Sequence, residues 1–542
     1  MINPNEYSRL FPVALFSSTW SSRSLLLDTL GFLATVPFVL SIFFILWQED
    51  VLFPVIGGLF IGSIIFSKFN PLFGFLNITD VFIVNALTDN INIFILGILI
   101  EGLLLFSLLN RGGYLNTLRR EFTKRALTRT RLEYIVSLST FLIFIDRYLS
   151  SFLVGLFTKP FAEKKRLQPV KHAFLLNTLS TSFSPLIPFT TLTPVIITSI
   201  GTSFGVLGIG YAPLKAFYRS LPFQYYNIFS IFIAFSTILL DKELFFMRCY
   251  NGEPEKRTGQ TDTLSFDMGL LTRKQMSLNR SLYATAGSLL LVFGVIATGF
   301  ILKWQGHTQL HALKVESILK IFIGALFTGI IYIVLFSLIT KTESYSNYKV
   351  KRKEISFSLL ITFFYVILAM SIASLARKLD LSSSLLGVLF KKTPLISFFP
   401  LIFFLFSCFI SFLCGSFLLT TTTVIPLAIR LISSSLPDPL MIEGVMFASV
   451  GAVISGASFG DINSPFSLNF IISAAAAETS VFGHFKSQIG YSLLAFLITI
   501  VFGYLLFAVG VKPYLSIASG LLVIGITFLF LYSEVPILKR IK

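Results

Sequence analysis

Charged side chains interrupt two otherwise apolar stretches of the sequence. Asp146 and Arg147 stand in the middle of segment 133–158, and Asp461 follows a glycine in GDINSP at 460–465. A charge in apolar surroundings is costly, so each is a candidate for function. Carboxylates beside hydroxyls and carbonyls suit a cation such as Na⁺. We predict that all three bind a substrate or ion. A structural ion pair or a tip that reaches water is the alternative for the first two, and an N-cap for Asp461.

Polar and acidic side chains elsewhere could complete such a site. Glu478 follows a run of four alanines and Glu101 lies inside the apolar stretch 91–109, so both, with Asp146 and Asp461, are candidates for carrying protons. Glu478 could equally mark a helix end, and Glu101 could be a buried hydrogen-bonded side chain. The candidate neutral ligands are Asn177, Ser184, Thr190, Thr191, Thr421, Asn463, Ser464 and Ser467.

Composition identifies the elements that must position these residues. Of 542 residues, 54% are hydrophobic and 13% charged, whereas soluble domains are about 25% charged. The chain is therefore predicted to be an all-α polytopic membrane protein with the lipid bilayer as its main partner. The net charge of +17 would suggest nucleic acid in a soluble protein. In a membrane protein, Lys and Arg collect in cytoplasmic loops, so no nucleic-acid partner is expected.

Apolar runs of about 20 residues predict the membrane-spanning helices. With the interrupted regions, they give about 11–13 transmembrane helices. The first residues lack the features of a signal peptide, so the first helix is expected to direct insertion. The predicted spans are 29–47, 51–67, 91–109, 190–209, 224–240, 282–302, 318–340, 355–375, 488–508 and 513–532.

Segment 133–158 is predicted to enter the membrane and return as a re-entrant hairpin. The loops at 111–131 and 159–171 are strongly basic, with seven and five basic residues against one acid each. Both should be cytoplasmic. A single crossing between them, with one flank translocated, is the alternative. The charged pair at the middle of the segment favours the hairpin, with two arms of about 12 residues each.

The chain is predicted to be one transporter domain, 1–542, built from two inverted repeats. The hydrophilic linker 241–281 separates repeat 1 (90–240) from repeat 2 (318–508). Each half contains a re-entrant hairpin followed by a broken helix with a Ser-Pro pair. Paired broken segments indicate a binding site at the membrane midplane. Chance recurrence of Ser and Pro is the alternative.

Four long segments carry a resemblance to a known family. They resemble the NhaC family of Na⁺/H⁺ antiporters, within the ion-transporter superfamily. The segments are RGGYLNTLRREFTKRALTRTRLEYIVSLSTFLIFIDRYLSSFLVG (111–155), KHAFLLNTLSTSFSPLIPFTTL (171–192), LCGSFLLTTTTVIPLAI (413–429) and GAVISGASFGDINSPFSLNFIISAAAAETSVFGHFKSQIGYSLL (451–494).

Three positions depart from the acids of that family. Arg147 replaces the second of two neighbouring acids, and Asn177 and Leu468 stand where the family has Asp. Asp146 and Asp461 remain. Cation–proton exchange needs carboxylates that hold a cation in one state and a proton in the other, and this chain has fewer of them than its relatives.

The resemblance implies a secondary transporter of the cell inner membrane that works by alternating access. The first hypothesis is antiport of Na⁺, or another monovalent cation, against H⁺. No metal is expected beyond a transported Na⁺ near Asp461, and no cofactor. The second is exchange or symport of organic acids or amino acids, with Arg147 in place of a bound cation. No P-loop or catalytic motif is present, so an enzyme is not expected. The chain could form a homo-oligomer.

Overall fold

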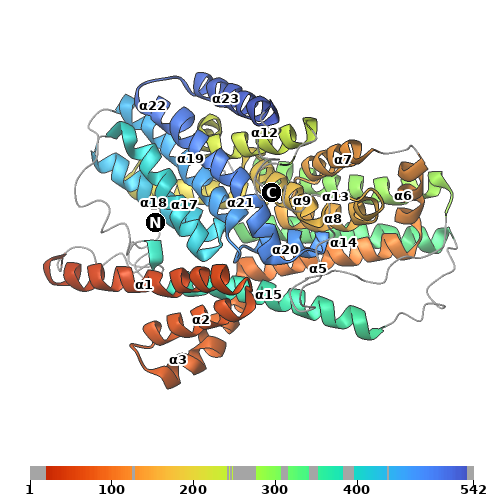
Figure 1. Ribbon diagram of the computed structural model, residues 1–542, viewed down its shortest axis with the longest axis horizontal. Helices are drawn as coiled ribbons and strands as arrows, with labels where there is room; N and C mark the ends of the chain where they lie inside the picture. Colours follow the sequence, from red (N-terminus) through yellow and green to blue (C-terminus); the bar gives the residue numbers. More distant parts are fainter. Residues whose placement is uncertain are drawn as a thin grey trace.

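The computed structural model describes residues 20–124, 128–240, 243, 247, 276–306, 315–340, 352–382, 396–435 and 439–533. Helices make up nearly all of this part of the chain (Figure 1). Nine of them are long and apolar enough to cross a membrane, which confirms the prediction of an all-α polytopic membrane protein. The predicted linker 241–281 lies almost wholly outside the described residues.

The predicted simple spans all correspond to helices. They are α1 (Trp20–Gln48), α2 (Leu52–Phe66), α5 (Asn90–Arg111), α10 (Thr193–Leu207), α12 (Tyr225–Leu239), α13 (Leu278–Gly306), α14 (Val315–Ile339), α15 (Arg352–Lys378), α21 (Val481–Ile498) continuing through a wider turn into α22 (Leu506–Ala508), and α23 (Pro513–Ser533).

One spanning helix was missed in the sequence. Residues Pro71–Thr88 form α3 (Pro71–Asn77), a wider turn, and α4 (Val84–Thr88), and together they are long enough to cross a membrane. This stretch has the lowest mean hydropathy of the nine candidate spans in the described part of the chain, because Asn77, Thr79 and Asp80 interrupt it. With α2, α3 projects from the main body of the protein (Figure 1).

Segment 133–158 folds as a helical hairpin. Its arms are α7 (Arg129–Leu142) and α8 (Arg147–Lys164). The Ser150 hydroxyl donates to the Thr140 carbonyl at 3.1 Å, across the turn. The broken helix that follows consists of α9 (Pro169–Phe183) and α10, because Pro185, Pro188 and Pro194 deny the backbone N–H groups that a continuous helix needs.

The second half repeats this order. Its hairpin is α17 (Phe399–Cys414) and α18 (Phe417–Ser435), joined by Gly415 in the left-handed conformation, with φ of 62°. Its broken helix is α19 (Pro439–Asn463) and α20 (Leu468–Ala477). Pro465 interrupts the helix, and the Ser467 side chain caps α20 by accepting from the Phe470 N–H.

The two broken helices run in opposite directions. Helix α20 runs parallel to α8: Ser151 bonds to Asn469, Gly155 packs against Ala476, and Lys159 pairs with Glu478. Helix α9 runs antiparallel to α8, since Ser151 meets the Leu176 carbonyl and Thr158 meets His172. One broken helix therefore begins at the end of the molecule where the other finishes, as expected for inverted repeats. The repeat bounds stay a prediction.

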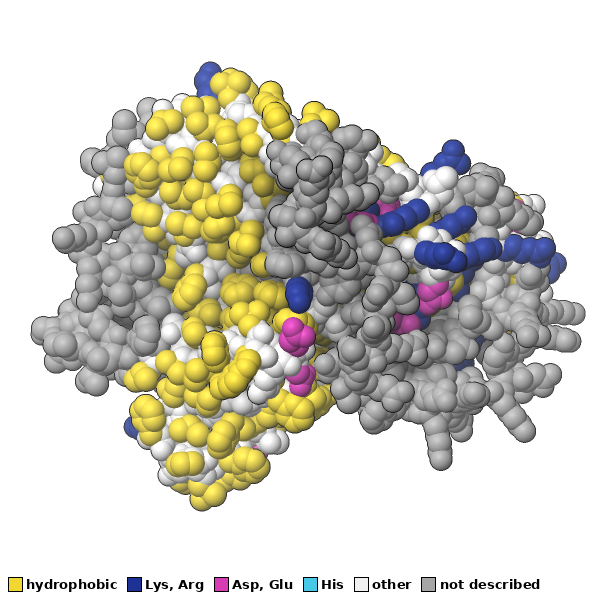
Figure 2. Space-filling view, in the orientation of Figure 1, with side chains coloured by type: hydrophobic (Ala, Val, Ile, Leu, Met, Phe, Trp, Pro, Cys, Tyr) yellow, Lys and Arg dark blue, Asp and Glu magenta, His cyan; other side chains and the backbone are white. Residues whose placement is uncertain are grey.

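Charge distinguishes the two ends of the molecule. Lys and Arg side chains gather at the end where α6 (Tyr114–Lys124) lies, while hydrophobic side chains cover much of the described remainder of this face (Figure 2). At the other end of α5, Arg377 pairs with Asp89 and Asn90 bonds to Glu316. The positive-inside rule predicts that the α6 end faces the cytoplasm, and this orientation stays a prediction.

Candidate functional site

The tip of the first hairpin is fixed by Asp146. Its carboxylate accepts the Leu149 N–H at 2.9 Å and so caps α8. The second carboxylate oxygen accepts the Thr191 hydroxyl at 2.7 Å, and the Thr191 N–H donates to the Ile145 carbonyl at 3.0 Å. The break between α9 and α10 is thereby held against the tip. Asp146 is 2% exposed, and it has no ion-pair partner among the described side chains.

Arg147 joins the two halves. The Nη1 atom of the guanidinium lies 2.5 Å from a carboxylate oxygen of Asp461, and Nη2 donates to the Tyr148 hydroxyl at 2.6 Å. The guanidinium also lies over the rings of Tyr148 and Phe417, at 4.7 and 4.9 Å from their centroids. Such contacts are strongest when the cation is removed from water. Arg147 is therefore held by both hairpins and by the second broken helix.

Asp461 completes the site from the second half. Its other carboxylate oxygen accepts the Ser467 hydroxyl at 2.8 Å, and Ser467, rather than Asp461, caps α20. We refer to the assembled groups as the tip cluster. It holds two carboxylates and one guanidinium, so its formal charge with all three groups ionised is one net negative charge. Its members are Asp146, Arg147, Tyr148, Thr191, Phe417, Asp461 and Ser467.

A neutral polar network lies beside the tip cluster, and Asn469 is a member that the sequence analysis missed. The Asn469 amide donates to Asn177 at 3.1 Å and to Thr181 at 2.8 Å. Asn177 in turn donates to the Ile462 carbonyl at 2.9 Å, and its amide also reaches Gln488 at 3.2 Å. The network joins α9 to both pieces of the second broken helix through uncharged amide and hydroxyl groups. A polar residue within an apolar run is the signal that could have identified Asn469.

The other predicted neutral ligands hold the breaks locally. Thr190 donates to the Ser184 carbonyl at 3.0 Å, and Asn463 donates to the Phe459 carbonyl at 2.8 Å. Ser464 accepts the Phe466 N–H at 3.3 Å. The Thr421 hydroxyl bonds to the Phe417 carbonyl of its own helix at 3.0 Å. Their roles as ligands stay predictions.

Neither of the further proton candidates belongs to the tip cluster. Glu478 follows the last residue of α20 with a φ of 54° and pairs with Lys159 on α8. Its side chain is 30% exposed. Glu101 lies on α5, and one of its carboxylate oxygens is buried without a hydrogen-bond partner in the described part of the chain.

A second buried ion cluster lies near the base of the first hairpin, and the sequence analysis missed it as well. Lys171 on α9 lies 3.0 Å from Glu133 on α7 and 3.6 Å from Glu243. Arg129 pairs with both acids. Two cations and two carboxylates balance one another, so this cluster carries no net charge.

A cavity extends from the tip cluster to the first turns of α5 and the last turns of α15. Its volume is about 210 Å³, several times the volume of a water molecule. Tyr148, Gly415 and Leu468 line it beside the tip cluster, and Asn92 and Arg377 line it at the other end. Hydroxyl groups on its wall come from Ser416, Thr422 and Thr423.

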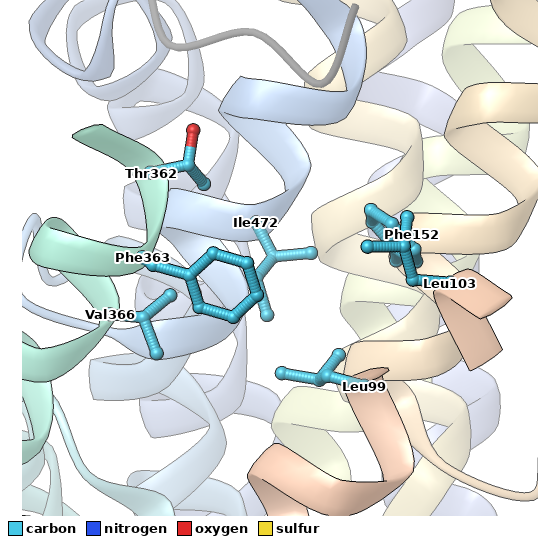
Figure 3. Close-up of a pocket in the computed structure, with 7 residues that line it drawn as sticks. All are labelled: Leu99, Leu103, Phe152, Thr362, Phe363, Val366 and Ile472. Atoms are coloured by element: carbon cyan, nitrogen blue, oxygen red, sulfur yellow. The ribbon is translucent and has the colours of Figure 1, made fainter. Parts of the chain in front are cut away.

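A second, much smaller cavity of about 20 Å³ lies between α5, α8, α15 and α20 (Figure 3). Six of its seven lining residues are apolar, among them Leu99, Phe152 and Ile472. The hydroxyl of the seventh, Thr362, points away from the others in Figure 3. A cavity of this kind provides no ligands for an ion.

Comparison with known proteins decides the family. A family model described as the Na⁺/H⁺ antiporter family matches residues 195–509, more than half of the chain. The chain belongs to the Na⁺/H⁺ antiporter family. The resemblance to NhaC-type antiporters found in the sequence is thereby confirmed. Asp461 lies inside the matched residues of the family model, whereas Asp146 and Arg147 precede them.

Two curated relatives agree with this membership in the Na⁺/H⁺ antiporter family. An uncharacterized protein of Haemophilus influenzae is 25% identical over 475 residues, which cover 84% of this chain and 87% of the relative. The Na(+)/H(+) antiporter NhaC of Bacillus subtilis is 40% identical over 103 residues, which cover 19% of this chain and 21% of the relative. No solved structure matches the chain.

Proposed function

We propose that the protein exchanges a monovalent cation, Na⁺ in the first instance, for H⁺ by alternating access, with Asp146 as the exchanging carboxylate. One observation carries the proposal: of the two acids in the tip cluster, Asp461 is paired with Arg147 and Asp146 is not. Asp146 accepts hydrogen bonds from the Thr191 hydroxyl and the Leu149 N–H, and no described cation forms an ion pair with it. The net negative charge of the cluster therefore belongs to Asp146.

A buried, unpaired carboxylate must be neutralised, and either a proton or a cation can do so. The two compete for the same oxygen atoms, and this competition is the basis of exchange. Thr191 suits both states, because a hydroxyl can donate to the carboxylate or turn its oxygen toward a cation. Broken helices that meet at the site supply the other backbone oxygens that a dehydrated cation needs.

The 210 Å³ cavity is our proposed route from the tip cluster to the outside. At the α6 end, the buried Glu133–Lys171 ion pair ties α7 to α9. We propose that this conformation is closed toward the cytoplasm, and that transport requires this contact to rearrange. We place the carrier in the cell inner membrane.

Proteoliposomes with a trapped pH dye test the function. A Na⁺ gradient should drive H⁺ movement in the wild type and in Asp80→Asn, a matched substitution at an exposed position. Asp146→Asn should abolish the response. Normal exchange by Asp146→Asn would overturn the assignment of this carboxylate, and no response in the wild type would overturn cation–proton antiport itself.

Exchange of small organic acids or amino acids is the second candidate. The observation that favours it is a fixed guanidinium one side chain away from a 210 Å³ cavity, with Tyr148 between them. Arginine recognises carboxylates through paired hydrogen bonds. Counterflow of labelled carboxylates in the same vesicles tests it: accumulation without Na⁺-driven H⁺ movement would favour this function over antiport.

A further inference from the structure

We infer that Arg147 is a permanent internal counter-ion that fixes the exchange at one cation per proton and makes transport electrically silent. The inference rests on the proposed function and adds its stoichiometry. Its basis is the geometry of the tip cluster, in which one guanidinium and two carboxylates are buried together.

The charge of the tip cluster is unbalanced by one unit. Arg147 cancels Asp461, which leaves the charge of Asp146. The second buried ion cluster is balanced within itself, since Arg129 and Lys171 face Glu133 and Glu243. One bound proton or one bound monovalent cation therefore brings the tip cluster to neutrality. Both loaded forms carry the same charge.

Equal charge in the two loaded forms makes the exchange silent. If the cation-loaded and proton-loaded forms reorient with the same net charge, a complete transport cycle moves no net charge across the membrane. The empty form is different, because it would have to reorient with a buried uncompensated carboxylate, which is costly. The carrier then reorients only when it is loaded, so exchange is obligatory.

Arginine suits this role better than lysine would. A guanidinium stays protonated in proteins, whereas a buried ammonium readily loses its proton. A lysine at this place could itself carry a transported proton, which would change the number of protons exchanged per cation. Arg147 is further held by the Tyr148 hydroxyl and by two aromatic rings, so its charge stays beside Asp461.

Reversal measurements test the inference in the wild type. Proteoliposomes are given a fixed pH gradient, and we measure the ratio of inside to outside Na⁺ concentration at which net H⁺ movement stops. The measurement is made with and without a membrane potential, which a tenfold potassium gradient and valinomycin set. A silent exchanger gives the same ratio in both conditions. Transfer of one net charge per cycle would shift it about tenfold and overturn the inference. Absence of Na⁺-driven H⁺ movement would instead overturn the proposed function.

Variants test whether Arg147 is the cause. Arg147→Gln leaves two uncompensated carboxylates, which take up two protons but one cation, so its ratio should become sensitive to the potential. Asp461→Asn leaves Arg147 to neutralise Asp146, and exchange should be lost. The double variant Arg147→Gln with Asp461→Asn has one carboxylate again, and silent exchange should return. A double variant that folds but does not exchange would contradict the charge count.

Two controls complete the set. Arg430→Gln removes an exposed guanidinium on α18 and should leave the exchange silent. Glu101→Gln removes the partly buried acid on α5, which stands outside the count; a change in its reversal ratio would contradict the inference. Elution of each variant as a single species in detergent shows that it has folded. If Arg147→Gln fails this check, the wild type and the double variant still decide the outcome.

Discussion

A guanidinium nitrogen of Arg147 lies 2.5 Å from a carboxylate oxygen of Asp461, and both side chains are 1% exposed. The pair connects the tip of the first hairpin to the last turn of α19. Arg147 therefore stands beside a carboxylate of the second half and provides the cation that this carboxylate needs. This leaves Asp146 as the acid that we propose exchanges a cation for a proton.

Thr191→Val removes the one side-chain hydrogen bond to Asp146. The variant should keep exchange but bind the cation more weakly, because a hydroxyl ligand and a bond to a charged group, worth about 1.5–3 kcal/mol, are lost. The half-saturating Na⁺ concentration should rise about tenfold or more. Thr328→Val is the control, since that hydroxyl bonds only to its own helix at the Ala325 carbonyl. An unchanged Na⁺ dependence in Thr191→Val would show that the bond plays no part in ion binding.

Gly415→Ala should lower thermal stability more than Gly510→Ala. Both glycines have positive φ, of 62° and 89°, so both substitutions carry the left-handed cost of about 1–2 kcal/mol. Only at Gly415 would the new methyl group meet a backbone, with its carbon 2.6 Å from the Phe466 carbonyl carbon. Thermal unfolding in detergent measures the difference. Equal shifts in Tm would show that the second hairpin tip tolerates separation from the break.

Glu478→Gln should retain exchange at a rate within about twofold of the wild type, and its stability should fall by no more than about 1 kcal/mol. The reason is its position: Glu478 pairs with Lys159 at a partly exposed helix end, away from the tip cluster. Initial rates of Na⁺-driven H⁺ movement test this expectation. A loss as complete as that expected for Asp146→Asn would make Glu478 a coupling residue.

Lys171→Met should be strongly destabilising, by about 3–5 kcal/mol, since it leaves the buried Glu133 and Glu243 to share the partly exposed Arg129. Adding Glu243→Gln restores the balance of one carboxylate and one cation in that cluster, and should recover part of the lost stability. Thermal unfolding of the single and double variants measures the recovery. Additive losses would show that the two charges do not interact.

The sequence predicted the positions of the helices and breaks that form the site better than it predicted which side chains contact one another there. Apolar run lengths located the simple spans, and Asp146, Pro185, Gly415 and Pro465 marked the tips and breaks, because the effects of capping, glycine and proline are local. The helix at Pro71–Thr88 was missed because its polar residues shorten the apolar run. Polar residues within an apolar run therefore marked the tips and breaks correctly, but at Pro71–Thr88 they concealed a spanning helix.

The contacts between the halves were beyond a single sequence. The Arg147–Asp461 pair and the Asn177–Asn469 bond each join residues about 300 positions apart. Such pairs depend on how α8, α9 and α20 pack. Residue type indicated that Arg147 needed a partner in apolar surroundings, but not which acid would provide it. For the same reason the sequence did not show that Lys171 pairs with Glu133.

The wide separation of Arg147 and Asp461 has a consequence for biosynthesis. The two residues lie 314 positions apart, and at about 5–20 residues per second the ribosome needs about 15–60 s to travel from one to the other. Arg147 begins α8 at the hairpin tip, where an arginine in apolar surroundings is costly, and through that interval the neighbouring Asp146 is the carboxylate beside it. The Arg147–Asp461 pair can form only after the second broken helix has been made. We therefore expect the first hairpin to reach its final contacts late in biosynthesis.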